Sequence, residues 1–318
     1  MRTSKAILIV GGSGTLGTQL ALKLRHAHRV YSTYLTKPIR IDGVTSLPLN
    51  LGDRTWCKRL LYTLHPEVII YCAGNSDPAY AAAHERLADL AHSAGPSSML
   101  ATTDYGAPKF IYLSSAYVFD GGRGNYHEND VVLPSSALGK FKVGGENFIR
   151  GKSVNYIIVR PSPVIVRGNG YSQTFFDRLI HALSHRESLS LPSSDLYSFT
   201  HISTLVELIA RLVDAGIRNK TIHCSGLTRA SYFDFGQLFA QRFGFDPSLL
   251  VASGAAVPGV SGGYQGGKSA ISSAGVQHLD FSLNCSQAAE TLKLKPLLLE
   301  ECFDLIEQDL VGGTPRTT

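Results

Sequence analysis

The chain has 318 residues, of which 44% are hydrophobic and 17% charged, a composition typical of a globular protein with an extended buried core. Its apolar runs are five or six residues long and are broken by Gly, Pro or charge, which excludes a membrane-spanning helix of roughly 20 apolar residues. The formal net charge is +5, but Lys and Arg are dispersed in runs of no more than two, so the sequence does not predict a nucleic-acid-binding stripe.

The N-terminal residues do not form a secretory signal, because the apolar stretch that follows them ends in a glycine-rich loop rather than at a cleavage site. A cytoplasmic protein is therefore expected. The cysteines are scattered and none forms a Cys-x-x-Cys pair, which predicts reduced, mostly buried thiols and no metal site. They are Cys57, Cys72, Cys224, Cys285 and Cys302.

The first predicted element is a strand, Ala6–Val10, that leads into Gly-Gly-Ser-Gly-Thr-Leu-Gly and then into an amphipathic helix. This order of strand, glycine loop and helix is typical of a dinucleotide site, where helix N–H groups face the pyrophosphate. Three glycines have distinct roles: a tight turn, a close backbone approach and close packing of helix on strand. The residues predicted to contact the cofactor here are Gly11, Ser13, Gly14, Thr15, Leu16 and Gly17.

The end of the second predicted strand, Arg29–Tyr34, indicates which nicotinamide cofactor is used. An acidic residue there would bind the adenosine ribose and repel a 2′-phosphate, but the chain has hydroxyls and nearby cations instead. Thr33, Lys37 and Arg40 are the candidates, and NADP(H) is favoured over NAD(H). Asn50 and Leu51 follow a third strand, where an adenine pocket is expected.

Short β-branched or aromatic runs alternate with helical patterns along the rest of the first 225 residues. Their continuous apolarity predicts strands covered on both faces, at Val68–Cys72, Phe110–Ser114, Tyr156–Arg160 and Thr221–Ser225. Helices are predicted at about Phe175–His185, Ser203–Ala215, Tyr232–Phe243 and Leu297–Leu310. Residues 252–276 are rich in Gly, Ser and Ala and predict a surface loop, with a lid over a substrate pocket as the alternative.

These elements predict an α/β fold with a doubly wound parallel sheet, the Rossmann arrangement, and a smaller C-terminal substrate lobe. The NAD(P)-binding domain would span residues 1–160, completed by parts of 201–225, and residues 161–318 would form mainly the substrate lobe. Ligands bind at the carboxyl edge of such a sheet, where Ala73, Gly74, Ser115 and Pro161 would converge.

With these motifs together, the chain resembles the extended short-chain dehydrogenases/reductases, and within them the dTDP-4-dehydrorhamnose reductase type of sugar-nucleotide reductase or epimerase. The resemblance runs from about Ala6 to Ile306 and rests on the glycine loop and several later motifs. They are Tyr71-Cys72-Ala73-Gly74, Leu113-Ser114-Ser115-Ala116-Tyr117-Val118-Phe119-Asp120-Gly121, Tyr126-His127-Glu128, Val159-Arg160-Pro161, Phe199-Thr200-His201-Ile202 and Ser225-Gly226-Leu227-Thr228.

The resemblance implies that Ser115 hydrogen-bonds the substrate carbonyl and that Lys142 contacts the nicotinamide ribose. The proton donor of the family should be a tyrosine at position 138, where this chain has leucine. An asparagine expected in the preceding helix aligns with His92, and Ala116 replaces a residue that is usually acidic. A leucine cannot transfer a proton, and general acid–base help is typically worth about 10²–10⁴-fold in rate.

Three accounts of Leu138 stay open at this level. In the first account another group is recruited as the acid, with Tyr117 the first candidate beside Tyr126, His92 and His127. The fold could catalyse non-redox chemistry that needs no tyrosine. The chain could also be an NAD(P)-binding regulatory or scaffold subunit without turnover. The expected partner is a small-molecule substrate such as a nucleotide sugar, and a homodimer is expected only by analogy.

Overall fold

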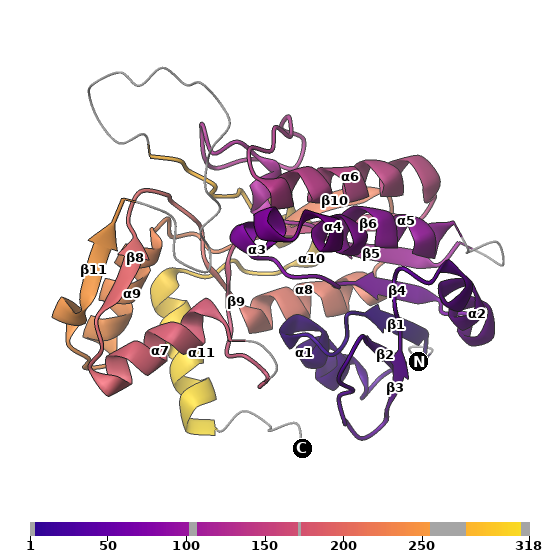
Figure 1. The fold of residues 1–318 in the computed structure, drawn as a ribbon, viewed down its shortest axis with the longest axis horizontal. Coiled ribbons are helices and arrows are strands. Elements are labelled where there is room, and N and C mark those ends of the chain that lie inside the picture. The colour runs from indigo at the N-terminus through magenta and orange to yellow at the C-terminus, as the bar shows by residue number, and fades with distance from the viewer. Residues whose placement is uncertain (1–3, 102–106, 171–172, 255–277, 313–318) are drawn as a thin grey trace.

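In the computed structural model, which describes residues 4–101, 107–170, 173–254 and 278–312, a seven-stranded sheet forms the larger part of the molecule (Figure 1). All its strands are parallel, in the spatial order β10-β6-β5-β4-β1-β2-β3. The strands are β1 (Ala6–Val10), β2 (Arg29–Tyr34), β3 (Val44–Pro48), β4 (Val68–Tyr71), β5 (Lys109–Leu113), β6 (Tyr156–Pro161) and β10 (Lys220–Cys224). The predicted doubly wound sheet is confirmed, and the predicted strand bounds agree to within one residue.

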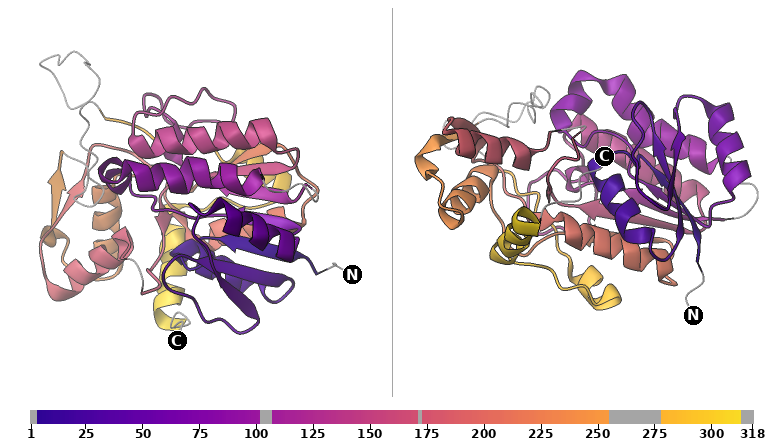
Figure 2. Two further views of the ribbon diagram at one scale, coloured as in Figure 1. Left: turned by 45° about the vertical axis from the view of Figure 1, so that its right-hand side comes forward. Right: turned by 90° about the horizontal axis from the view of Figure 1, so that it is seen from below.

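Helices cover both faces of this sheet, as the continuous apolarity of its strands requires (Figure 2). One face packs against α1 (Thr15–Leu24), α8 (Ile202–Asp214) and α10 (Ser286–Leu292), and the other against α2 (Arg54–Leu64), α5 (Gly95–Leu100) and α6 (Ala137–Lys152). Alternate residues of one strand serve the two faces: Ile7 and Ile9 belong to the first core, Leu8 and Val10 to the second.

Between β4 and β5 the chain forms α3 (Pro78–Ala83), α4 (Glu85–Asp89) and a π-helical turn (Leu90–Ala94) that continues into α5. The hydroxyls of Tyr71 and Tyr112, from β4 and β5, donate to the carbonyl oxygens of Ala91 (2.7 Å) and His92 (2.6 Å) in that turn. The side chains of the sheet therefore hold the widened turn in place, and His92 is carried inward beside α6.

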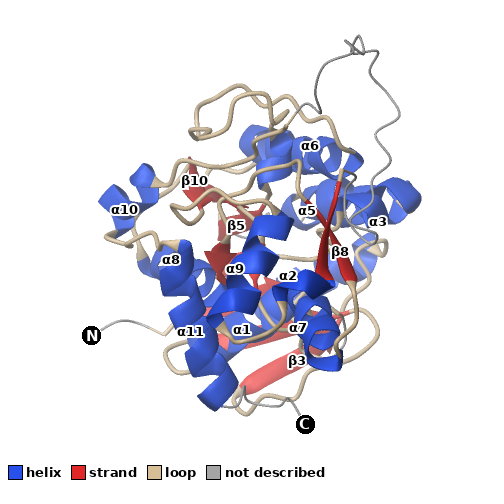
Figure 3. Cartoon of the chain, turned by 90° about the vertical axis from the view of Figure 1, so that its left-hand side faces the viewer, coloured by secondary structure: helices blue, strands red, loops and turns tan. Residues whose placement is uncertain are grey.

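The smaller lobe, which faces the viewer in Figure 3, lies beyond the carboxyl edge of the sheet, as Figure 1 shows from the side. It has its own aromatic core. It contains α7 (Phe175–His185), α9 (Tyr232–Arg242), α11 (Leu299–Gly312) and a two-stranded sheet of β8 (Leu189–Pro192) and β11 (Leu250–Ser253). A second pair, β7 (Val164–Ile165) and β9 (Thr200–His201), lies where the chain leaves and re-enters the large sheet.

The four predicted C-terminal helices are present, three of them with ends shifted by one or two residues. The predicted loop at 252–276 is wrong at its start, because Ala252 and Ser253 pair with β8 as part of β11; residues 255–276 lie outside the described residues. Among the residues that the structure describes, no helix is long and apolar enough to cross a membrane.

Candidate active site

The glycine loop joins β1 to α1 at the carboxyl edge of the sheet. Gly11 has φ +83°, and a Cβ there would lie 2.5 Å from the Cα atom of Ala73, so the ends of β1 and β4 touch through backbone alone. A Cβ at Gly17 would lie 2.4 Å from the carbonyl oxygen of Gly11. Gly14 is the N-cap of α1 and supplies no side-chain cap, and a helix N-terminus of this kind favours an anion.

Thr33 supports this loop from the neighbouring strand. Its buried hydroxyl accepts a hydrogen bond from the N–H of Gly11 (3.1 Å), and its carbonyl accepts from the N–H of Ser13 (3.1 Å). Lys37 and Arg40 are exposed beyond the end of β2, on the side where an adenosine 2′-phosphate is expected. Of the three residues predicted to select NADP(H), Thr33 therefore shapes the loop, and the two cations remain the candidates for contacting the phosphate.

The predicted adenine-side residues follow β3. The side chain of Asn50 accepts from the N–H of Gly52 (2.9 Å), which closes a tight turn, and half-buried Leu51 packs on the core beneath. Across the sheet edge, Gly74 has φ +106° and lies directly over the His92 ring, where a Cβ would approach Cε1 to 2.3 Å.

Ser115, at the end of β5, is buried beside the neighbouring strand ends. Its hydroxyl accepts a hydrogen bond from the N–H of Tyr117 (3.3 Å) and so begins a short 3₁₀ turn, Ala116–Val118. Because β4, β5 and β6 are neighbours in the sheet, Ala73, Ser115 and Pro161 lie at one edge, as the sequence predicts.

Lys142, on α6, is buried behind Ser115 rather than extended into solvent. Its ammonium donates to the carbonyl oxygen of Leu113 (2.6 Å) and lies 5.3 Å from the centre of the Tyr112 ring. Burial lowers the pKa of Lys142 from 10.5 to about 7, against the opposing influence of Cys72 and Glu146. An amine that titrates near neutrality can both hold and release a proton at the pH of a cell.

Leu138, one helical turn before Lys142, is a fully buried part of the core. It packs with Ala81 of α3 and Ala88 of α4, and half-buried Tyr117 and Phe141 cover this cluster. The tyrosine position is therefore filled by an apolar side chain that is buried under two short helices.

Three of the four aromatic or imidazole candidates for a replacement acid are poorly suited to that role. Burial, followed by the neighbouring Tyr197, raises the pKa of Tyr117 well above its ordinary value, and its hydroxyl donates to that of Tyr197 (3.4 Å). Tyr126 donates to a carboxylate oxygen of Asp120, and burial together with that bond raises its pKa.

His92 does not offer a proton either. Burial, then the charge of Lys142, lowers the pKa of His92 to about 3, so the ring is neutral, and its Nε2 bonds to the carbonyl of Asn75 (2.9 Å). His127 is exposed. Lys142 therefore has a pKa closer to neutrality than Tyr117, Tyr126 or His92.

A buried ion pair braces the strand ends behind this site. Arg160 of β6 makes two hydrogen bonds to Glu146 of α6 (2.9 and 2.7 Å), and Ser114 donates to the same carboxylate (2.5 Å). We did not predict this brace, although an arginine inside an otherwise apolar strand is a signal that could have revealed it.

Asn169, after β7, is a second contact that the sequence analysis missed. Its side-chain amide donates to the carbonyl of Ser13 (2.9 Å) and to the hydroxyl of Thr18 (3.1 Å). The segment that carries it is held by Asp177, which accepts from the N–H groups of Gly168 and Thr174. The segment leading into the lobe is thereby fastened to the glycine loop.

The glycine loop opens a helix that has no side-chain cap, Ser115 lies at the end of β5, and the buried Lys142 of α6 reaches the last carbonyl of that strand. This arrangement agrees with a family match over residues 5–260. The chain belongs to the RmlD substrate-binding domain family. The expected resemblance to dTDP-4-dehydrorhamnose reductases is confirmed with it.

Two relatives of this RmlD-family chain are named for different functions. One is a dTDP-4-dehydrorhamnose reductase of Mycobacterium tuberculosis, 24% identical over 252 residues and covering 78% of each chain. Another is the methionine adenosyltransferase 2 subunit beta of Xenopus laevis, 26% identical over 258 residues and covering 78% of this chain and 75% of the relative.

Among solved structures, dTDP-4-dehydrorhamnose reductase from Bacillus anthracis in complex with NADP has the same fold. Its TM-score is 0.76 at 20% identity, and the match covers 96% of this chain and all of that one. At this identity the similarity shows only that the two proteins share a fold, so any reaction must be inferred from the residues of this chain.

Proposed function

We propose that this protein is a nicotinamide-dependent reductase that acts on a keto group of a nucleotide-linked sugar or a comparable carbonyl metabolite. One observation carries the proposal. Ser115 and the amine of Lys142, whose pKa is about 7, both lie at the carboxyl end of β5, at the same sheet edge as the glycine loop and the N-terminus of α1. The named reductase relatives support the same class of reaction.

The residues present fit a dinucleotide. The N-terminus of α1, with Gly14 as its N-cap, would hold the pyrophosphate beside Thr15 and Leu16, because the N-terminus of a helix and its dipole favour anions. Ser13 would contribute through its side-chain hydroxyl, since its N–H is bonded to the carbonyl of Thr33. The ribose and nicotinamide would lie along the sheet edge past Ala73 toward Pro161. When bound, the nicotinamide ring supplies a hydride to the substrate carbonyl carbon.

NADPH is the preferred donor in this proposal. The end of β2 has no carboxylate to bind a ribose diol, and Lys37 and Arg40 are exposed just beyond it. Two cations there attract a 2′-phosphate, whereas a free 2′-hydroxyl gains nothing from them.

Ser115 would donate a hydrogen bond to the substrate carbonyl and so polarise it. Lys142 would release the proton that the product oxygen needs, since Leu138 cannot and the pKa of Lys142 is already near neutrality. The hydroxyl of Tyr117, which faces Tyr197 of the lobe, would contact the substrate without transferring a proton.

The deciding experiment is calorimetric titration with NADPH and NADH, followed by NADPH oxidation with dTDP-4-dehydrorhamnose as the test substrate. We expect tighter binding of NADPH, and turnover that Lys142→Arg removes while cofactor binding persists, because the guanidinium keeps the charge but does not release its proton. Absence of binding by either cofactor contradicts the proposal, and unchanged turnover in Lys142→Arg contradicts the role of the lysine.

A regulatory subunit is the second candidate, and the sealed position of Leu138 is the observation that favours it. The relative named as a subunit of methionine adenosyltransferase supports it as well. Under this alternative, NADPH binds, no carbonyl is reduced, and Lys142→Ala leaves binding to a protein partner intact.

A further inference from the structure

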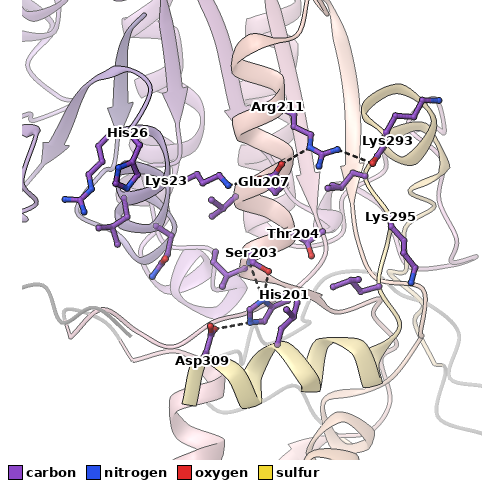
Figure 4. Close-up of a pocket in the computed structure, with 18 residues that line it drawn as sticks. Lys23, His26, His201, Ser203, Thr204, Glu207, Arg211, Lys293, Lys295 and Asp309 are labelled. Atoms are coloured by element: carbon purple, nitrogen blue, oxygen red, sulfur yellow. Dashed lines mark hydrogen bonds and ion pairs between the residues drawn. The ribbon is translucent and has the colours of Figure 1, made fainter. Parts of the chain in front are cut away.

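A separate pocket lies on the α1 and α8 face of the sheet, between these helices and the C-terminal segment 293–309 (Figure 4). Its volume is about 840 Å³, within the range that small-molecule sites occupy. None of the candidate cofactor or catalytic residues lines it. The pocket is therefore distinct from the site described above.

The lining combines an apolar wall with an excess of positive charge. The lining includes five Lys and Arg residues and two carboxylates, and the ion pair of Lys295 with Glu301 (2.6 Å) leaves an excess of two positive charges. Lys23 and Arg211 point toward Glu207, whereas Lys293 and Lys295 are directed away from it (Figure 4). The charged residues are Lys23, Arg25, Arg211, Lys293, Lys295, Glu207 and Asp309. The apolar wall consists of Leu22, Ile202, Val206, Leu294, Leu297 and Leu305.

The two carboxylates occupy different ends of the pocket. Asp309 lies 3.3 Å from Nε2 of His201, which caps the start of α8, so that end already has an anion. Glu207 is shared between two cations, Lys23 (2.9 Å) and Arg211 (2.8 Å). One carboxylate cannot balance two cations, and this second end is left positive.

Arg211 also ties this end to the C-terminal wall, because it donates to the carbonyl oxygens of Leu292 (2.8 Å) and Lys293 (3.1 Å). The Lys23 and Glu207 side chains are 51% and 33% exposed, so their ion pair is solvated and contributes little by itself. An incoming anion can therefore replace Glu207 as the partner of Lys23 at small cost.

The C-terminal wall lies outside the part of the chain that the family match covers. The family match ends at residue 260, whereas Lys293 to Leu297, Leu305 and Asp309 all lie beyond it. The pocket is thus built by joining family elements, α1 and α8, to a segment outside the matched part.

We propose that this pocket binds a small organic phosphate, with its phosphate group between Lys23 and Arg211 and its carbon body on the leucine-lined wall. Phosphate suits this end because guanidinium and ammonium groups both bind it through charge-assisted hydrogen bonds. The proposal does not depend on the reductase function.

The test measures binding of phenyl phosphate and inorganic phosphate by calorimetry at fixed ionic strength, with and without saturating NADPH. We expect saturable binding of phenyl phosphate, tighter than that of inorganic phosphate because the ring covers apolar surface. NADPH should not displace it. Displacement by NADPH would place the probe in the dinucleotide site and overturn the proposal, as would binding too weak to saturate.

Two variants separate a binding role from a structural one, because both break the same ion pair. Lys23→Gln should weaken phenyl phosphate binding about fivefold, and Glu207→Gln should strengthen it about fivefold, the effect of one partly exposed charge. Lys58→Gln, which removes an exposed charge on α2 outside the pocket, is the matched control and should change nothing. If both ion-pair variants weaken binding equally, or the control does so too, the phosphate is not held by these cations.

Discussion

The ammonium of Lys142 donates to the carbonyl oxygen of Leu113 at 2.6 Å, in a buried position at the end of β5. This contact joins the helix that lacks the family tyrosine to the strand that carries Ser115. A charged amine held there has few partners to offset its lost hydration, and its proton is correspondingly easy to remove.

The stability of the protein should rise as this proton is lost. The pKa of Lys142 is about 7 when folded and 10.5 ordinarily, so between these values the unfolded chain binds more protons, and the free energy of unfolding increases with pH. We expect Lys142→Met to be stabilised relative to wild type by a few kcal/mol near pH 6 and to lose that advantage toward pH 10. Thermal melts of both proteins across this pH range measure the effect, and parallel curves would contradict it.

Turnover should depend on the same proton. In the proposed reduction Lys142 donates its proton, so the rate at saturating NADPH should fall as pH rises through about 7. The reverse oxidation needs the neutral amine, so its rate should rise as pH rises through about 7. A rate that is flat between pH 6 and 8.5 in both directions would exclude Lys142 as the proton source.

Leu138→Tyr tests whether a tyrosine at this buried position can act as the proton donor that the family resemblance implies. Overpacking the cluster with Ala81 and Ala88 should lower stability by about 1–3 kcal/mol. Leu138→Phe is the matched control, because it adds the ring without the hydroxyl. A gain in NADPH oxidation by the tyrosine variant alone would show that the phenol reaches substrate, and equal rates in the two variants would show that it does not.

Asn169→Ala should weaken cofactor binding without unfolding the protein. The side chain donates hydrogen bonds to Ser13 and Thr18 of the loop and helix that would hold the cofactor. Losing about 1 kcal/mol of binding free energy, because the loop is less well held, corresponds to a roughly fivefold higher Kd for NADPH. Asn155→Ala is the control, because its amide also donates to a backbone carbonyl but lies far from the loop. Equal Kd values for wild type and Asn169→Ala would contradict a positioning role.

Glu146→Gln should be strongly destabilising at neutral pH, by about 3–5 kcal/mol, because it leaves Arg160 buried without a counter-charge. Burial alone would raise the pKa of Glu146, but the bonds from Arg160 and Ser114 and the charge of Arg150 hold it below 4.5. This stability is present above pH 4.5 and is lost as the carboxylate becomes protonated below that pH. The difference in unfolding free energy between wild type and variant should shrink in acid, and urea titrations at pH 7 and 4 measure it.

Much of the fold and part of the site were determined by local sequence. Residues 6–10 form a strand because five consecutive apolar side chains need cover on both faces, and Gly11 follows because only glycine allows φ +83° against Ala73. The family resemblance also rested on contiguous motifs. The absence of the family tyrosine could be read directly from the sequence, which has leucine at position 138.

Only the tertiary structure decided what surrounds those motifs. Burial of Leu138 under α3, the bond from Lys142 to Leu113, and the contact of Asn169 with Ser13 join residues 29 to 156 positions apart. Local periodicity contains no information on such pairs, because it reports which face a residue occupies and not what is packed against it. The pKa of Lys142 and the charge of the second pocket depend on desolvation and on distances between segments, which exist only once the chain has folded.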